Sequence, residues 1–160
     1  MTWRGSTTWK DRILSCLPYL LPLYYSLQFG GFLFRQFPIL RWITVPLLPI
    51  DWVFRQIPFG LGPLLVFLMI YMLVVRNTNI LHFIRFNAMQ AILLDIILFL
   101  CSIILGVFFN GSSASFIQET LFNVVFLGTL AAVSYSVVQS IRGQYAEIPT
   151  ISDAAYMQVQ

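Results

Sequence analysis

Few residues in this sequence have side chains that could catalyse a reaction or bind a metal. His82 is the only histidine, which rules out an HExxH zinc motif and a histidine-based metal cluster. Cys16 and Cys101 lie in apolar runs without CxxC spacing, so each is interpreted as a small buried hydrophobe. The Asn-Gly-Ser-Ser run at 110–113 is a turn former and does not match a GxSxG nucleophile elbow. We therefore expect no catalytic residue, no metal and no cofactor, and we do not expect an enzyme.

Asp95 is the one acidic residue inside a long apolar run. A single acid cannot form the carboxylate pair that an aspartyl mechanism requires. An acid in the middle of a bilayer costs about 2.5–3.5 kcal/mol on insertion scales. Asp95 therefore needs a partner, a proton or a water-filled cavity.

Other polar residues are expected at a similar depth, near the inside face of a membrane. The hypothesis is a polar cluster centred on Asp95 that faces the path of a substrate. The alternative is that Asp95 only caps or joins helices. The expected members of the cluster are Asn87, Gln90, Tyr135, Ser136 and Gln139, with the hydroxyls of Tyr19 and Tyr71 in reach.

Small residues recur at helical spacing in the last two apolar runs. Such stripes let helices approach closely and predict a packing seam between them. On the earlier run the stripe consists of Ala88, Ala91, Ser102 and Gly106 around Asp95. On the later run it consists of Gly128, Ala132 and Ser140 around Ser136.

The composition indicates that the chain is surrounded by lipid instead of water. The chain has 160 residues, 59% of them hydrophobic and only 9% charged, and its mean hydropathy is +0.83. Soluble domains carry about 25% charged residues, so this chain cannot coat a water-facing surface of its own size. The net charge of +3 comes from scattered basic residues, which predicts no nucleic-acid partner.

Four nearly charge-free segments are long enough to cross a bilayer as helices. They span about 13–29, 56–75, 88–109 and 120–141, and Pro18 and Pro22 are expected to kink the first. None alternates like a barrel strand. The predicted fold is all-α: a polytopic membrane protein of four transmembrane helices, forming a single membrane domain over 1–160.

The basic residues predict that both termini lie on the inside face. Six of them fall on the side of the termini and the 76–87 connection, and three fall on the other side. The six are Arg4, Lys10, Arg12, Arg76, Arg85 and Arg142, and the three are Arg35, Arg41 and Arg55. The first apolar run is broken by proline and precedes no A-x-A-like site, so no cleaved signal peptide is expected.

The connection over 30–55 is too apolar for an ordinary loop and too often interrupted by proline to cross a membrane. Its interfacial anchors are expected to be Trp42, Trp52, Arg41 and Arg55, because aromatic bodies with basic tips belong at the headgroup level. We predict short interfacial or re-entrant segments between the first and second spans. A membrane-hugging loop with no task of its own is the alternative.

Two local features are also predicted. Asp51 and Arg55 stand four residues apart in the order that favours an ion pair on a helix. The polar tail over 143–160 is expected to form a short helix after Pro149, with Ser152 as its N-cap, and to contact soluble partners.

The sequence resembles one known family. The run His-Phe-Ile-Arg-Phe-Asn-Ala-Met-Gln-Ala-Ile-Leu-Leu-Asp at 82–95 looks like the signature of the Tic-twenty family, the small four-helix subunit of the translocon at the inner envelope of chloroplasts. Leu-Pro-Tyr-Leu-Leu-Pro at 17–22, Leu-Phe-Asn at 121–123, Tyr-Ala-Glu-Ile-Pro at 145–149 and Ile-Ser-Asp-Ala at 151–154 also resemble it. The match includes polar residues that hydrophobicity alone would not select.

The resemblance implies a membrane-embedded part of a protein import channel, of the cyanobacterial or plastid-encoded type. It implies the plastid inner envelope or a cyanobacterial cell membrane, with both termini on the stromal or cytoplasmic side. The implied partners are other translocon subunits or copies of the chain, the preprotein and membrane lipid. It offers no catalytic residue.

Two other functions compete with this one. A non-conducting assembly subunit would use the small-residue seam to gather larger partners. A small-solute or ion transporter would show inverted repeats and helices broken at the midplane, for which the third and fourth spans give no proline signal. Four spans are few for a pore that admits a polypeptide, so conduction would need copies or partners.

Overall fold

The computed structural model describes residues 7–58, 61–109 and 116–159. Every regular element in these residues is helical, and none of them forms a strand. The predicted all-α class is therefore confirmed. Arg4, used above for the orientation, and the turn expected at 110–113 lie outside the described residues.

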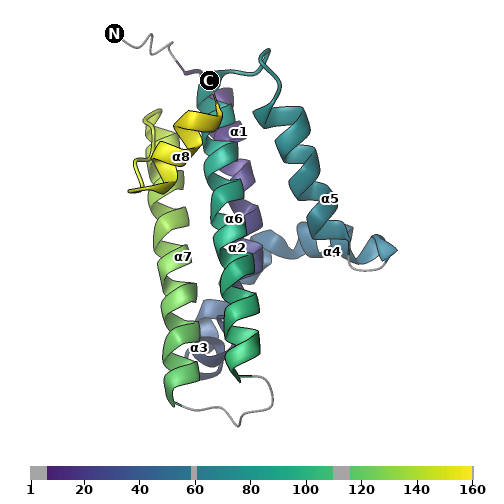
Figure 1. Cartoon of the computed structure of the whole chain (residues 1–160), viewed down its shortest axis with the longest axis vertical. Coiled ribbons are helices and arrows are strands. Elements are labelled where there is room, and N and C mark those ends of the chain that lie inside the picture. The colour runs from purple at the N-terminus through teal and green to yellow at the C-terminus, as the bar shows by residue number, and fades with distance from the viewer. Residues whose placement is uncertain (1–6, 59–60, 110–115, 160) are drawn as a thin grey trace.

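Two long antiparallel helices run the length of the molecule (Figure 1). Helix α6 spans His82–Phe109 and helix α7 spans Phe116–Arg142, with 28 and 27 residues. At 1.5 Å per residue each is about 40 Å long. Both are long and apolar enough to cross a membrane. Each begins earlier than the hydropathy predicts, because a helix continues through polar and aromatic residues that a search for charge-free windows excludes.

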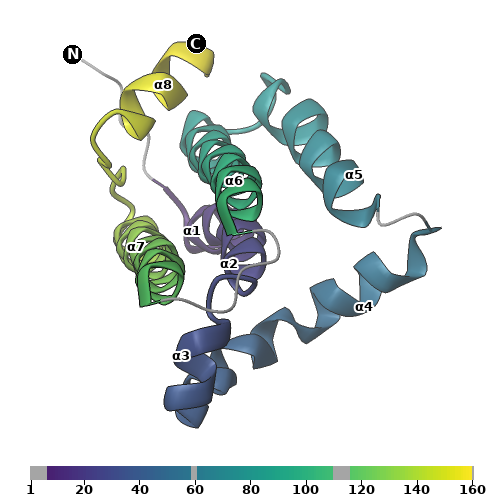
Figure 2. The ribbon, with the colours of Figure 1, turned by 60° about the horizontal axis from the view of Figure 1, so that its bottom comes forward.

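The first helical stretch packs against both α6 and α7 (Figure 2). It consists of α1 (Trp9–Cys16), a 3₁₀ turn η1 (Leu17–Tyr19) and α2 (Leu20–Ser26). Thr8 and Asp11 form a capping box at its start. The 3₁₀ turn contains Pro18, whose missing N–H breaks the α-helical ladder, so the break that the prolines predict is present.

The expected second span is not one continuous helix. Residue Gln56 ends α4, and the helical stretch that follows is only Gly62–Val75. It comprises α5 (Gly62–Met69) and a π-helix, η4 (Ile70–Val75). A helix of this length reaches about 21 Å, less than a hydrocarbon core of about 30 Å. Pro58 follows the end of α4 and Pro63 stands in the first turn of α5, so this apolar run is not one helix.

The segment before it runs across the axes of α6 and α7 (Figures 1 and 2). It contains α3 (Gly31–Gln36), the 3₁₀ stretch η2 (Pro38–Leu47) and α4 (Leu48–Gln56). The side chains of Trp42 and Trp52 are 73% and 65% exposed, and Arg41 and Arg55 are also exposed. Short helices across the bundle are thus present, and their contact with lipid stays a prediction.

The expected ion pair on α4 is confirmed. The Nε atom of Arg55 lies 2.7 Å from Oδ2 of Asp51. The hydroxyl of Tyr24 donates to the other carboxylate oxygen of Asp51 at 3.0 Å, which ties α4 to α2. Arg55 is exposed, so the pair contributes little on its own.

The chain reverses after α7 and returns over one end of the bundle. Gly143 adopts φ +74°, a conformation that favours glycine. Residues 144–148 are not helical, and α8 follows at Ile151–Gln158, so the predicted helix after Pro149 is confirmed. Ser152 as its N-cap is wrong, because Thr150 takes that position and Ser152 lies inside the helix.

The starts of α1 and α6 and the end of α7 meet at the same end of the bundle, which we call the α8 end (Figure 1). The Nη1 atom of Arg12 donates to the carbonyl of Ile141 at 3.2 Å. The Nδ1 atom of His82 lies 3.0 Å from the Tyr145 hydroxyl. These contacts connect three parts of the chain that are far apart in sequence.

Candidate functional site

The first turns of α6 are enclosed on every side. Residues 83–92 are all buried, which is unusual for a helix at a bundle surface. The cause is that α1, α2, η4, α7 and α8 all pack around this part of α6. Polar groups placed here must find partners inside the protein.

Asn87 is fully buried, and its side-chain amide makes three hydrogen bonds. Its Oδ1 atom accepts from the hydroxyls of Tyr19 and Ser140, both at 2.9 Å. Its Nδ2 group donates to the carbonyl of Phe83 at 2.8 Å, one turn earlier on α6. Asn87 thus joins the first helical stretch, α6 and α7 at one point.

Gln90, also fully buried, connects the same point to the tail. Its Oε1 atom lies 3.2 Å from the Tyr19 hydroxyl, which Asn87 shares. Its Nε2 group donates to the backbone carbonyl of Ala146 at 3.2 Å and lies 3.4 Å from the Ser152 hydroxyl. A side chain of a long helix therefore holds the backbone of the non-helical tail.

Ser152 organises the tail around that contact. Its hydroxyl donates to the Ala146 carbonyl at 3.0 Å and accepts from the Ile148 N–H at 2.7 Å. We call this set of buried, uncharged groups the amide network: Tyr19, Asn87, Gln90, Ser140 and Ser152. It combines amide donors and acceptors at one end of an otherwise apolar bundle, which suits hydrogen bonding to a peptide backbone.

The other polar residues expected in this cluster take different places. Ser136 is fully buried next to Tyr19. Tyr135 is 41% exposed, and its hydroxyl accepts from Gln139 at 3.3 Å on the outer face of α7. Tyr71 packs at the edge of the apolar cluster under α8. The structure thus brings Asn87, Gln90 and Ser136 together around Tyr19. Tyr135 and Gln139 lie apart from them.

Asp95 does not lie at the centre of this network. It is eight residues beyond Asn87, which is about 12 Å further along the helix. The residue is only 5% exposed, and among the described residues neither carboxylate oxygen has a hydrogen-bond partner. Tyr25 of α2 lies close enough to interact with its charge. Asp95 is a separate buried polar site in the middle of α6.

The small residues of the expected seam are divided between the two ends of the bundle. Ala88, Ala91 and Ser140 are buried at the α8 end, and Ala132 and Ser102 are half-buried. Gly106 and Gly128 face open space, since a Cβ atom built on either would meet nothing within 4 Å. Direct packing of α6 on α7 is limited, because α1 and α2 contact both of them.

Sequence reasoning missed the part that the tail plays in this site. Ser152 was expected to cap a helix and Ala146 was given no role, yet both hold the Gln90 amide. Two aromatic residues of the tail, Tyr145 and Tyr156, also pack on Phe86 of α6, at ring distances of 5.0 and 4.5 Å. The tyrosines in an otherwise polar tail were the available signal, because they mark an apolar face that needs burial.

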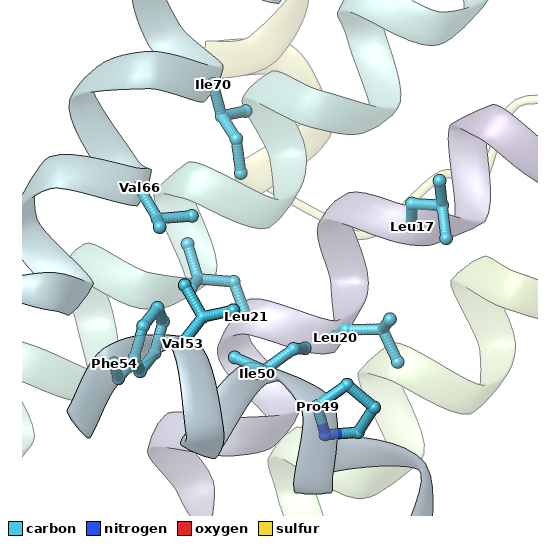
Figure 3. Close-up of a pocket in the computed structure, with 9 residues that line it drawn as sticks. All are labelled: Leu17, Leu20, Leu21, Pro49, Ile50, Val53, Phe54, Val66 and Ile70. Atoms are coloured by element: carbon cyan, nitrogen blue, oxygen red, sulfur yellow. The ribbon is translucent and has the colours of Figure 1, made fainter. Parts of the chain in front are cut away.

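An apolar hollow lies between η1, α2, α4, α5 and η4 (Figure 3). Its volume is about 270 Å³, and its lining includes Leu21, Val53, Phe54, Val66 and Ile70. No charged or hydrogen-bonding side chain lines it, so it fits hydrocarbon and offers no chemistry. Within the ranges that the structure describes, no group of three or more His, Cys, Asp or Glu residues could hold a metal ion.

Comparison with known proteins decides the family. The family model described as "Chloroplast import apparatus Tic20-like" matches residues 3–155. The chain belongs to the Tic20-like family. This is the Tic-twenty family that the residues at 82–95 suggest, so the resemblance is confirmed.

Relatives of the Tic20-like family match over most of their length. A "Tic20 family protein" of Synechocystis is 49% identical over 156 residues, covering 94% of this chain and 94% of that protein. "Protein TIC 20-II, chloroplastic" of Arabidopsis thaliana is 34% identical, covering 93% of this chain and 72% of the plant protein. "Tic20 family protein Ycf60" of Porphyra purpurea is 34% identical, covering 99% and 80%.

The residues that carry the family resemblance coincide with the enclosed part of the bundle. The run over 82–95 contains Asn87, Gln90 and Asp95, and nearly all of it is buried. The Leu-Pro-Tyr run contributes Tyr19, and the Tyr-Ala-Glu-Ile-Pro run contributes the carbonyl of Ala146. Four of the five runs that carry the resemblance therefore contribute to the amide network, and the Leu-Phe-Asn run at 121–123 does not.

Proposed function

We propose that this chain is a multi-pass membrane subunit of a protein translocation apparatus. The single observation that carries the proposal is the match to the "Chloroplast import apparatus Tic20-like" model over residues 3–155. The relatives include a chloroplast protein of Arabidopsis thaliana and a protein of the cyanobacterium Synechocystis. The proposed location is accordingly a plastid inner envelope or a cyanobacterial cell membrane.

Exposed apolar side chains support a membrane location. Large hydrophobic residues cover the outer faces of α6 and α7, among them Phe99, Val107 and Val124, which are 63%, 73% and 61% exposed. A water-soluble monomer rarely exposes apolar patches of this size. In the proposed four-span arrangement, the stretches 9–26 and 62–75 also enter the bilayer beside α6 and α7.

The proposed orientation places the α8 end on the stromal or cytoplasmic side. The basic residues near that end, including Arg12, Arg76 and Arg142, outnumber those on the other side. The crosswise segment then lies farther from that side, with α4 beside the middle of α6 and α3 near its far end (Figure 1). A polypeptide leaving the membrane would meet the amide network as it emerges.

The amide network supports a role in contacting a translocated polypeptide. An extended chain in hydrocarbon loses several kcal/mol for each backbone group that finds no hydrogen bond. Asn87 and Gln90 place buried amides in the part of the bundle where water is scarce, and Gln90 already binds a main-chain carbonyl there, that of Ala146. Their chemistry matches the need of a peptide backbone and matches no ionic or cofactor substrate.

A purely assembling subunit is the second candidate, favoured by one observation. Gly106 and Gly128 leave open space on the outer faces of two long helices, where another helix could approach closely. Copies or partners at this surface would also supply the walls of a pore that one chain is too small to enclose. In either proposed role, the chain itself breaks no covalent bond.

Isolation of an engaged complex tests the proposal. A preprotein with a folded C-terminal domain is stalled in membranes that carry a tagged copy of the chain, with a photo-crosslinking amino acid at position 136 or 124. We expect the preprotein to co-purify with the tag and to crosslink from buried position 136 but not from Val124 on the exposed face of α7. Recovery of the stalled preprotein without the chain would refute the translocation role. Co-purification with crosslinks only to neighbouring subunits would support the assembling role instead.

A further inference from the structure

The tail contacts the amide network through its main chain, as a peptide ligand would. Residues 144–148 form no helix or strand, yet Ala146 is fully buried. Its backbone carbonyl receives the Gln90 amide at 3.2 Å. The contact is made through the main chain, so it does not depend on the side chain of Ala146.

An aromatic side chain accompanies this backbone contact. Tyr145, directly before Ala146, packs edge-on against Phe83 and Phe86, with ring centroids 5.2 and 5.0 Å away. Its hydroxyl lies 3.0 Å from Nδ1 of His82. The surface under the tail therefore pairs one hydrogen-bond donor for a backbone carbonyl with one place for an aromatic ring.

The docked tail is also held in a conformation that opposes docking. Thr150 has φ +69° and ψ −46°, and the N–H of Ile151 donates to the carbonyl of Pro149 at 2.8 Å. These values describe a γ-turn with positive φ, which is rare and strained for a residue with a side chain. Such strain persists only where the surrounding contacts compensate for it, and undocking of the tail would relieve it.

We propose that residues 144–148 are an internal occupant of a binding site for extended polypeptide. The site consists of the Gln90 amide and the rings of Phe83 and Phe86, and it takes a backbone carbonyl that follows an aromatic residue. A translocated chain would displace the tail and occupy the same surface. This inference rests on the proposed function, because the ligand that it names is the translocated polypeptide.

The position of α8 reports directly on displacement. Ala155 is fully buried where α8 packs on Val75, Phe86 and Met89. Met157, two residues later on the same helix, is 73% exposed. A cysteine at 155 should react with a maleimide only when the tail leaves, whereas a cysteine at 157 should react at all times.

The test uses the full chain, purified in detergent, with Cys16 and Cys101 replaced by alanine and carrying Ala155→Cys or Met157→Cys. A cysteine-free polypeptide that is unfolded in solution is added, or a synthetic peptide with the sequence of residues 143–149. We expect either one to raise the labelling rate at 155 and to leave the rate at 157 unchanged. The peptide with alanine in place of Tyr145 should have a weaker effect. No increase at 155 with either probe would overturn the inference.

Gln90→Met distinguishes a polypeptide-binding site from a surface on which the tail only packs. Loss of the Gln90 hydrogen bonds to Ala146 and Ser152 should raise the basal labelling at 155 by at least about 2- to 10-fold. The same variant should lose most of the response to the added polypeptide, because the donor that holds its backbone is gone. A variant that responds to the polypeptide as strongly as the parent would refute the site.

Ser152→Ala provides the matched variant on the tail itself. It removes the hydroxyl that organises Ala146 and Ile148 and leaves the proposed site on α6 intact. We expect higher basal labelling and a preserved response to polypeptide. Circular dichroism and elution volume check that both variants fold. If these labelling results are not obtained, the inference that the tail occupies a polypeptide-binding site is refuted. The translocation role is tested separately, by co-purification with a stalled preprotein.

Discussion

At the scale of single residues, the two buried polar sites of α6 differ in how well they are satisfied. Asn87 has three hydrogen bonds with good geometry, from three different elements. Asp95 is almost as deeply buried, but both of its oxygens lack a partner within the described part of the chain. A satisfied buried network stabilises one structure, whereas an unsatisfied buried acid destabilises it. Asn87 therefore stabilises the fold. Asp95 destabilises it, which suggests a role other than stability.

Tyr19→Phe tests the structural weight of the amide network. The substitution removes the shared hydroxyl and leaves the buried Oε1 of Gln90 without its donor. We expect unfolding in detergent to become easier by about 1–3 kcal/mol. Tyr135→Phe is the matched control, because the Tyr135 hydroxyl is on the exposed face of α7 and its loss should cost less than about 0.5 kcal/mol. Equal effects of the two substitutions would contradict the network.

Asp95→Leu should have opposite effects on stability and on activity. Leucine removes two buried oxygens without partners, so we expect a gain of about 1–3 kcal/mol in thermal unfolding in detergent. Preprotein import by membranes that carry the variant should fall, because costly intramembrane acids are usually functional. Asp95→Asn, which keeps the polar volume, should retain more import than leucine. A loss of stability with leucine would mean that Asp95 joins helices, and unchanged import would exclude a contact with the substrate.

At the scale of elements, the passage from α4 to α5 depends on one glycine. A Cβ atom on Gly62 would lie 2.9 Å from the Cα of Phe54 and 3.1 Å from its carbonyl oxygen. Both contacts are with backbone, which cannot rotate away. This close approach brings the start of α5 against the end of α4.

Gly62→Ala should therefore destabilise the chain, by about 1–3 kcal/mol as for other overpacked sites. Gly31→Ala is the matched control. Gly31 begins α3, and a Cβ atom there meets nothing within 4 Å. Thermal unfolding of the two variants in the same detergent makes the comparison, and we expect the control to match the parent or exceed it slightly. A tolerated Gly62→Ala would show that α4 and α5 can separate without cost.

The elements that sequence predicts best are those with a long, uninterrupted apolar run. Helices α6 and α7 were predicted by hydropathy, but the start of α6 was placed at residue 88 instead of His82, since polar and aromatic residues carry no such signal. The second span, expected over 56–75, is shorter in the structure, because composition does not register that α4 continues to Gln56 and that α5 begins only at Gly62. Asn87 and Gln90 were predicted as polar cluster members from their position near the membrane surface. Their contact with Ala146 was not, because it depends on a reversal at Gly143 and a γ-turn at Thr150.

At the scale of the whole molecule, the bundle is compact at one end and open at the other. Around the α8 end, four helices and the tail enclose α6. Farther along, α6 exposes Ile103, Ile104 and Val107, and Gly106 lies among them in open space. A helix with a glycine flanked by exposed β-branched residues can take a close neighbour at little entropic cost. In the proposed assembly, these open faces are where copies or partner helices would bind.

Leucine at the two open glycines tests that surface. Gly106→Leu combined with Gly128→Leu fills space that is empty in the single chain, so the variant should fold, and helix content should stay the same or rise because leucine favours helix over glycine. Association through these faces should weaken by about tenfold or more, since a clash of 1–3 kcal/mol in a packed contact corresponds to that factor. Crosslinking yield and the size of the complex after mild solubilisation measure it. Val107→Leu and Val124→Leu together form the control, because they enlarge side chains that are already 73% and 61% exposed. If both pairs leave the complex unchanged, these faces are covered by lipid, and the subunit joins its partners through the crosswise segment or the α8 end.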